Sequence, residues 1–131
     1  MNRTPPLLAV LGLLLGCASD VPPACDRMCV AATAVYGSCL GAAGGWSAGG
    51  YDDADDFAGS CDTWAWEMRR LEDDAVQRGA LDAPGAVAAT CRARADALSD
   101  AAAAGDTASD AADSCAAFAA FDWHTPPWES E

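Results

Sequence analysis

Seven cysteines in a chain of 131 residues constrain the fold of this protein more than any other feature. Six of them lie between residues 25 and 115, and the seventh, Cys17, follows a short apolar run. Without residues 1–16, the chain has 21 large apolar residues (Leu, Val, Phe, Met, Trp and Tyr) among 115, whereas the whole chain has 32 alanines. So small a core is marginal against the conformational entropy of one domain, and we expect covalent cross-links to contribute much of the stability.

The N-terminal residues have the layout of an export signal. Arg3 precedes the apolar run of residues 7–15, which is too short to span a membrane permanently. The sequence Leu14-Leu15-Gly16-Cys17 resembles the lipobox of bacterial lipoproteins. That resemblance implies cleavage after Gly16 and attachment of a diacylglycerol to the Cys17 sulfur, which would anchor the protein stably in a membrane. The alternatives are an ordinary cleaved signal peptide and a short buried helix.

The residue after Cys17 bears on localisation. In lipoproteins of bacteria with two membranes, an Asp at this position commonly retains the protein at the inner membrane, so Ala18 implies the outer membrane by the same resemblance. We therefore expect a cell-envelope protein that is attached to the membrane through Cys17 and that has an envelope or extracellular protein partner. The net charge of −13 and the absence of Lys argue against binding nucleic acid.

The apolar spacing predicts an all-α domain, a small bundle of about four helices stapled by three disulfides. The expected organisation is a signal peptide (1–16), a lipidated cysteine with its tether (17–23), the helical domain (24–121) and a tail rich in Pro and aromatic residues (122–131). The helices are expected to run from Pro23 to a stop at Gly41, from a cap at Asp52 or Asp53 to Gly79, and from Asp82–Pro84 to Gly105. A fourth is expected to begin at Thr107, with Ala119 as its last inward-facing residue, and the Pro pair at 126–127 excludes helix after about Thr125. The inward face of the second helix is predicted to contain Phe57, Cys61, Trp64, Met68, Leu71 and Ala75, whereas the charged residues from Glu67 to Asp74, Glu72 included, are predicted to be solvated.

The cysteines other than Cys17 form an even set, which favours disulfides in an exported protein. Their spacing does not match the common zinc, haem or thioredoxin-like motifs. If four helices alternate in direction, the heights of the cysteines along them rank the possible pairs. This argument predicts the pairs Cys25–Cys115, Cys29–Cys91 and Cys39–Cys61.

No catalytic constellation is evident in the sequence. His124 is the only histidine and lies in the C-terminal tail, whereas a catalytic base is normally held rigidly and partly buried. The glycine pairs at residues 44–45 and 49–50 lack the flanking residues of a phosphate-binding loop. We therefore expect neither enzymatic activity nor a cofactor.

An acidic cluster is the weak candidate for a metal site. Calcium or another hard cation requires several converging oxygen ligands. An EF-hand loop counted from Asp53 fails, because Ala58 and Trp64 occupy its sixth and twelfth positions. A helix cap with a solvated acidic first turn is the favoured interpretation of the cluster, and a divalent-cation-binding module is the alternative function. The cluster consists of Asp52, Asp53, Asp55 and Asp56.

Three tryptophans are candidates for interaction. Trp66 points about 200° away from Trp64 around the helix, and it either packs against the loop of residues 46–51 or forms part of an exposed patch. Trp123 and Trp128 flank a Pro pair in the tail, which either folds back on the helices or binds an external partner. The favoured function is an interaction or structural module.

Overall fold

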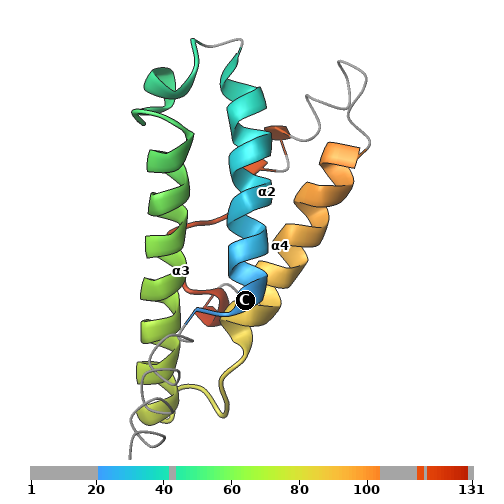
Figure 1. Cartoon of the computed structure of the whole chain (residues 1–131). Coiled ribbons are helices and arrows are strands. Elements are labelled where there is room, and N and C mark those ends of the chain that lie inside the picture. The colour runs from blue at the N-terminus through green and yellow to red at the C-terminus, as the bar shows by residue number, and fades with distance from the viewer. Residues whose placement is uncertain (1–20, 42–43, 104–114, 117, 130–131) are drawn as a thin grey trace, which may run out of the picture.

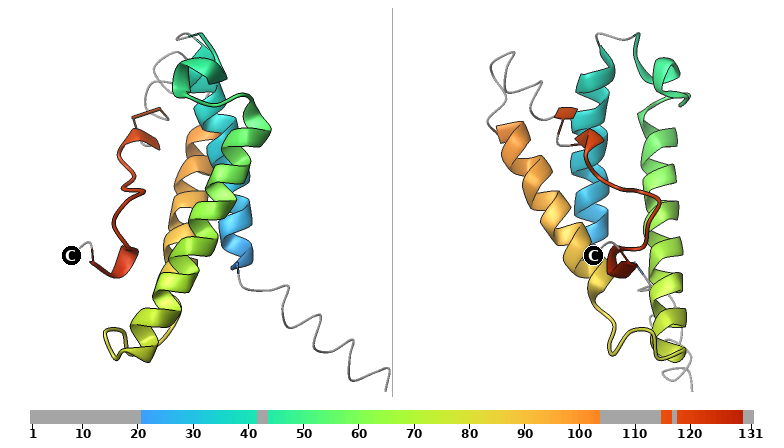
Figure 2. Two further views of the ribbon diagram at one scale, coloured as in Figure 1. Left: turned by 90° about the vertical axis from the view of Figure 1, so that its left-hand side faces the viewer. Right: turned by 180° about the vertical axis from the view of Figure 1, so that it is seen from behind.

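The computed structural model describes residues 21–41, 44–103, 115–116 and 118–129. These residues form three long helices, α2 (Pro23–Leu40), α3 (Ala54–Gln77) and α4 (Ala86–Ala103), and two short 3-10 helices, η2 (Trp46–Gly49) and η3 (Pro127–Glu129). Helix α2 lies between α3 and α4, and the C-terminal segment (residues 115–116 and 118–129) crosses one face of the three helices (Figures 1 and 2). The described part contains no β-strand, which confirms the all-α class.

The structure corrects the expected number of helices from four to three. Residues 104–114, which include most of the fourth expected helix, lie outside the described residues, and its described end has helical backbone at residues 115–116 and 118–119. The chain leaves this conformation before Asp122, whose carboxylate accepts hydrogen bonds from the backbone amides of His124 and Thr125. Residues 1–20, with the predicted export signal and Cys17, also lie outside the described part. None of the helices that are described is both long enough and apolar enough to cross a membrane.

Two of the three long helices begin where the sequence predicts. Helix α2 begins at Pro23, where the missing N–H of proline costs no helical hydrogen bond. Asp53 is the N-cap of α3, and its carboxylate accepts a hydrogen bond from the backbone amide of Asp56 at 2.8 Å. Helix α3 ends before Gly79, which has a φ of +75° that an L-residue rarely adopts.

Glu72 determines how α3 is joined to α4. Its side chain is 1 % exposed, and its carboxylate accepts hydrogen bonds from the backbone amides of Gly85 and, at 3.1 Å, of Val87. Amides at the start of a helix have no partner within the helix, so Glu72 caps α4 from a neighbouring helix. The prediction that Glu72 is solvated and Leu71 faces inward is therefore wrong. The buried residues of α3 are Phe57, Cys61, Ala65, Met68, Glu72 and Ala75.

All six cysteines of the described domain form disulfides, but the predicted pairs are wrong. The bonds are Cys25–Cys91, Cys29–Cys61 and Cys39–Cys115. Helices α2 and α4 run in the same direction from the same end of the molecule, as expected for helices that alternate in direction (Figure 1). Cys91, however, lies level with Cys25 and not with Cys29, which is one turn further along α2.

The connection between α2 and α3 explains why Cys61 pairs with Cys29 and not with Cys39. It places Phe57 in one buried cluster with Ala32 and Val35, so that Cys61, one turn later in α3, lies beside Cys29 rather than Cys39. Cys39 lies near the far end of α2, where the chain that follows α4 brings Cys115 to it.

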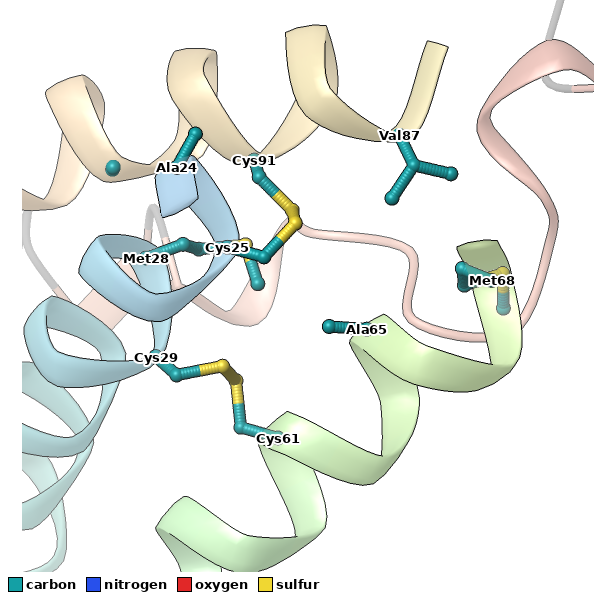
Figure 3. Close-up of a cluster of buried hydrophobic side chains, with 10 residues drawn as sticks. Ala24, Cys25, Met28, Cys29, Cys61, Ala65, Met68, Val87 and Cys91 are labelled. Carbon is teal, nitrogen blue, oxygen red and sulfur yellow. A yellow bond between two sulfur atoms is a disulfide. The ribbon is translucent and has the colours of Figure 1, made fainter. Parts of the chain in front are cut away.

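The core consists of two small clusters. One contains the two buried disulfides Cys25–Cys91 and Cys29–Cys61, which Figure 3 shows, together with alanines, one valine and two methionines. The second contains Ala32, Val35, Phe57 and Leu98. Partly buried aromatic residues of the C-terminal segment pack against both clusters, so this segment completes the core on one face.

Candidate functional site

A pocket of about 530 Å³ lies where α3 faces the C-terminal segment and the end of α2. Its volume is within the range of small-molecule sites in proteins. Residues from α2, the following loop, α3 and the C-terminal segment line it together, so the pocket exists only in the folded domain. Half of its lining residues are aromatic: Tyr36, Tyr51, Phe57, Trp64, Phe118 and Trp123.

Tyr36 is the centre of the aromatic packing at one end of the pocket. Its ring stacks on Phe118 at a centroid distance of 4.8 Å and lies 5.0 Å from the ring of Phe57. Tyr51 meets Phe57 edge-on at 5.1 Å. A Cβ at Gly37 would lie 2.8 Å from the Trp46 ring, so glycine at this position lets η2 pack closely on α2. These contacts restrain the rings of the pocket wall.

Trp64 and Trp123 form the other end of the aromatic wall. Their rings are 5.2 Å apart in an edge-to-face arrangement. The indole Nε1 of Trp64 donates a hydrogen bond to the backbone carbonyl of Trp123 at 2.7 Å. This bond joins α3 directly to the C-terminal segment and holds the Trp123 ring at the pocket.

Arg94 of α4 holds the C-terminal segment from the adjacent side. Its guanidinium carbon lies 5.4 Å from the Trp64 ring centroid, 5.1 Å from that of Phe121 and 4.9 Å from that of Trp123. Its Nη2 donates to the carbonyl of Asp122 at 2.8 Å, and its buried Nη1 has no hydrogen-bond partner among the residues that the structure describes. Desolvation lowers the pKa of Arg94, and the charge of Asp122 opposes this, but a guanidinium remains protonated in proteins. Attraction between this cation and the three rings therefore helps to fix the segment.

The turn at Asp122 directs the chain along the pocket. The carboxylate accepts hydrogen bonds from the backbone amides of His124 at 2.9 Å and Thr125 at 3.0 Å. The pKa of Asp122 is lowered to about 2. The largest cause is the backbone hydrogen bond from Thr125, followed by the hydrogen bond from its side chain and then by the backbone hydrogen bond from His124. Asp122 is therefore ionised at neutral pH and offsets the charge of Arg94. His124 itself is exposed and lines the pocket.

Polar residues of one face of α3 form the rim of the pocket. Ser60, Thr63 and Glu67 are exposed and follow one another at helical spacing. The Thr63 hydroxyl donates to the backbone carbonyl of Gly59 at 3.0 Å, whereas the Glu67 carboxylate makes no ion pair among the described residues. No arginine of the described part lines the pocket. The rim is therefore polar and carries one negative charge.

The acidic cluster at the start of α3 acts as a helix cap. Asp53 accepts from the amide of Asp56, and the carboxylate of Asp56 accepts from the amide of Asp52 at 3.0 Å. Asp55 is exposed in the first turn. Among the described residues, no group of three or more His, Cys, Asp or Glu side chains is placed to hold a metal ion.

The three candidate tryptophans lie in different environments. Trp66 is 50 % exposed, and Arg70 lies over its ring at 5.7 Å. Trp123 and Trp128 are partly buried against the core cluster that contains Cys25–Cys91 and Cys29–Cys61, so the tail folds back on the helices. Of these three residues, Trp123 alone lines the aromatic pocket.

Sequence reasoning missed most of the site. It identified Trp64 and Phe57 as core residues and Tyr51 as part of a loop, and it assigned no role to Arg94. A mixed pattern of aromatic and polar residues on one helix is the only local signal, and it does not indicate which other segment completes a pocket. Comparison of the chain with protein-family models, curated proteins and solved structures finds no match.

Proposed function

We propose that this protein is a lipid-anchored cell-envelope protein whose disulfide-linked helical domain is an interaction module, with the aromatic pocket as its binding site. The proposal rests on the aromatic pocket. Aromatic clusters that only stabilise a fold normally fill their own volume, because protein interiors are close-packed. Here six rings line one half-open pocket of about 530 Å³, and exposed polar residues lie at its rim.

The likeness of residues 14–17 to a lipobox supports the anchoring. From Cys17 to the first residue of α2 is six residues, which can extend at most about 20 Å. A domain tethered so closely stays at the membrane surface, where its ligand would be another envelope component or a molecule that reaches the envelope. Three disulfides suit a small domain in that oxidising compartment.

No observation favours the alternative, a divalent-cation-binding module. The carboxylates of Asp53 and Asp56 accept hydrogen bonds from backbone amides at the start of α3. Hard cations require several oxygen ligands that converge on one point. No such group occurs in the described part of the chain.

Site-directed photo-crosslinking in the native envelope tests the binding site. A photoreactive amino acid replaces Thr63 at the pocket rim, and its matched control replaces Asp62, the preceding residue, which lines a separate hollow between α2 and α3. We expect a discrete adduct from position 63 that is absent at position 62. The Ser60→Trp variant, which fills the pocket, is expected to abolish the adduct. Equal labelling at both positions, or labelling that persists in Ser60→Trp, would reject the pocket as the binding site.

A further inference from the structure

The composition of the pocket wall indicates the class of ligand that it accepts, and this inference rests on the proposed function. The faces of aromatic rings carry negative electrostatic potential and attract organic cations. Six of the lining residues provide such rings, and Glu67 adds a carboxylate at the rim. The chain has no lysine, and none of its described arginines lines the pocket.

The wider surroundings of the pocket are also negative. A shallow hollow that contains Asp55 and Asp56 shares Ser60 and Thr63 with the pocket, so the acidic start of α3 continues into its rim. The nearby positive charge of Arg94 is offset by Asp122, which the guanidinium contacts through its backbone carbonyl. Two of the pocket rings, Trp64 and Trp123, already have this guanidinium within 5.4 Å and 4.9 Å of their centroids, so they pack against a delocalised cation within the fold.

We infer that the pocket binds an organic cation with an apolar body, of the quaternary ammonium class. A trimethylammonium group donates no hydrogen bonds, so it needs ring faces and a nearby carboxylate rather than an array of acceptors. The pocket offers this combination. A hard metal ion would need several oxygen ligands instead, and the described residues provide no such set.

The test compares choline with its uncharged isostere 3,3-dimethyl-1-butanol. The two molecules have the same shape and differ in one atom, nitrogen or carbon, at the centre of the trimethyl group. Saturation-transfer NMR of the trimethyl signal measures both on the full-length, lipidated, oxidised protein in a maltoside detergent. We expect choline to bind about tenfold more tightly than the alcohol, which is the size of a partly desolvated cation–π contribution.

Three variants separate the effect of charge from that of shape. Glu67→Gln is expected to weaken choline binding about threefold and to leave the alcohol unchanged, because one partly screened carboxylate is lost. Asp62→Asn removes the same charge on α3 outside the pocket and is expected to have no effect. Ser60→Trp is expected to abolish the binding of both molecules.

The outcomes also distinguish this inference from the proposed function. Equal affinity for the alcohol and choline would overturn the cationic class while leaving the pocket as a binding site. Absence of choline binding would overturn the inference, and the crosslinks from position 63 would then decide separately whether the pocket binds another ligand. Glycerophosphocholine tests the source of the cation: binding as tight as that of choline supports a lipid headgroup, and weaker binding supports a free cation.

Discussion

The indole nitrogen of Trp64 donates a hydrogen bond across 59 positions of sequence to the backbone carbonyl of Trp123. Its ring also meets the Trp123 ring at 5.2 Å, and the Arg94 guanidinium packs against both. The C-terminal segment is thus held to the helices by a small number of specific contacts. Because this segment forms one wall of the pocket, these contacts determine whether the pocket exists.

Replacement of Arg94 by Met should loosen the C-terminal segment. The variant keeps an apolar side chain but loses the cation over three rings and the hydrogen bond to Asp122, which together are worth about 1–2 kcal/mol. We expect faster proteolysis within residues 118–129 and a weaker near-UV tryptophan signal. Arg92→Met, on an exposed position of the same helix, is the control. Unchanged proteolysis would show that the other contacts of the segment suffice.

Replacement of Glu72 by Leu should destabilise the whole domain. The buried amide of Val87 would lose its acceptor, at a cost of about 1–3 kcal/mol, and the amide of Gly85, which is an exposed residue, would lose its acceptor at a smaller cost. We expect a lower denaturant midpoint in oxidised protein, measured by far-UV circular dichroism. Asp74→Leu is the control, because Asp74 is exposed and pairs only with Arg78 on the same helix. A midpoint equal to that of the control would contradict the capping role of Glu72.

Acid should release the turn at Asp122. The pKa of this carboxyl is lowered to about 2 in the folded chain, mainly by hydrogen bonds from Thr125, from a usual value of 3.8. A lowered pKa means that the contribution to stability is complete above about pH 4 and is lost as the pH falls toward 2. We expect the amide NMR shifts of His124 and Thr125 to titrate in that window. In Asp122→Asn these amide shifts should stay constant over the same pH range. A transition that persists in this variant would show that another group titrates.

Reduction of the disulfides should separate helix formation from docking. Alanine-rich helices form readily but bury little apolar area, so their packing depends on the cross-links. We expect reduced protein at neutral pH to keep a substantial helical far-UV signal and to lose the near-UV tryptophan signal. Cys39→Ser/Cys115→Ser, which leaves the two buried disulfides, should keep the helices docked. Cooperative unfolding of reduced protein at nearly the temperature of oxidised protein would show that the core is sufficient without disulfides.

Replacement of Cys17 by Ala should release the protein from the membrane. The acyl chains attached to this sulfur would supply the anchor, and no described helix can span a bilayer. We expect the variant to partition into the aqueous phase in a detergent phase-separation assay, or to remain as unprocessed precursor. The variant with Ser60→Trp, which leaves Cys17 intact, should partition with wild type. Continued detergent-phase partition of a processed Cys17→Ala chain would reject the lipoprotein proposal.

The sequence by itself determined the local structure of this protein. Pro23, the cap at Asp53 and the glycine at position 79 set the bounds of α2 and α3 to within one or two residues. The helical spacing of the cysteines placed four of the six in the buried core, and their even number predicted that all six would pair. These features depend on contacts between residues a few positions apart, which the order of residues specifies directly.

Only the tertiary structure decided which elements meet. The offset between α2 and α3 paired Cys29 with Cys61, and the position of α4 along α2 paired Cys25 with Cys91. The packing of α3 buried Ala65 and Glu72 in place of Trp64 and Leu71, although the rest of its inward face is as predicted. The pocket likewise depends on Arg94 and Trp64 meeting a segment nearly 30 to 60 residues away in sequence. Such contacts depend on the path of the loops and on the packing of whole helices, and neither is encoded in the periodicity of any one segment.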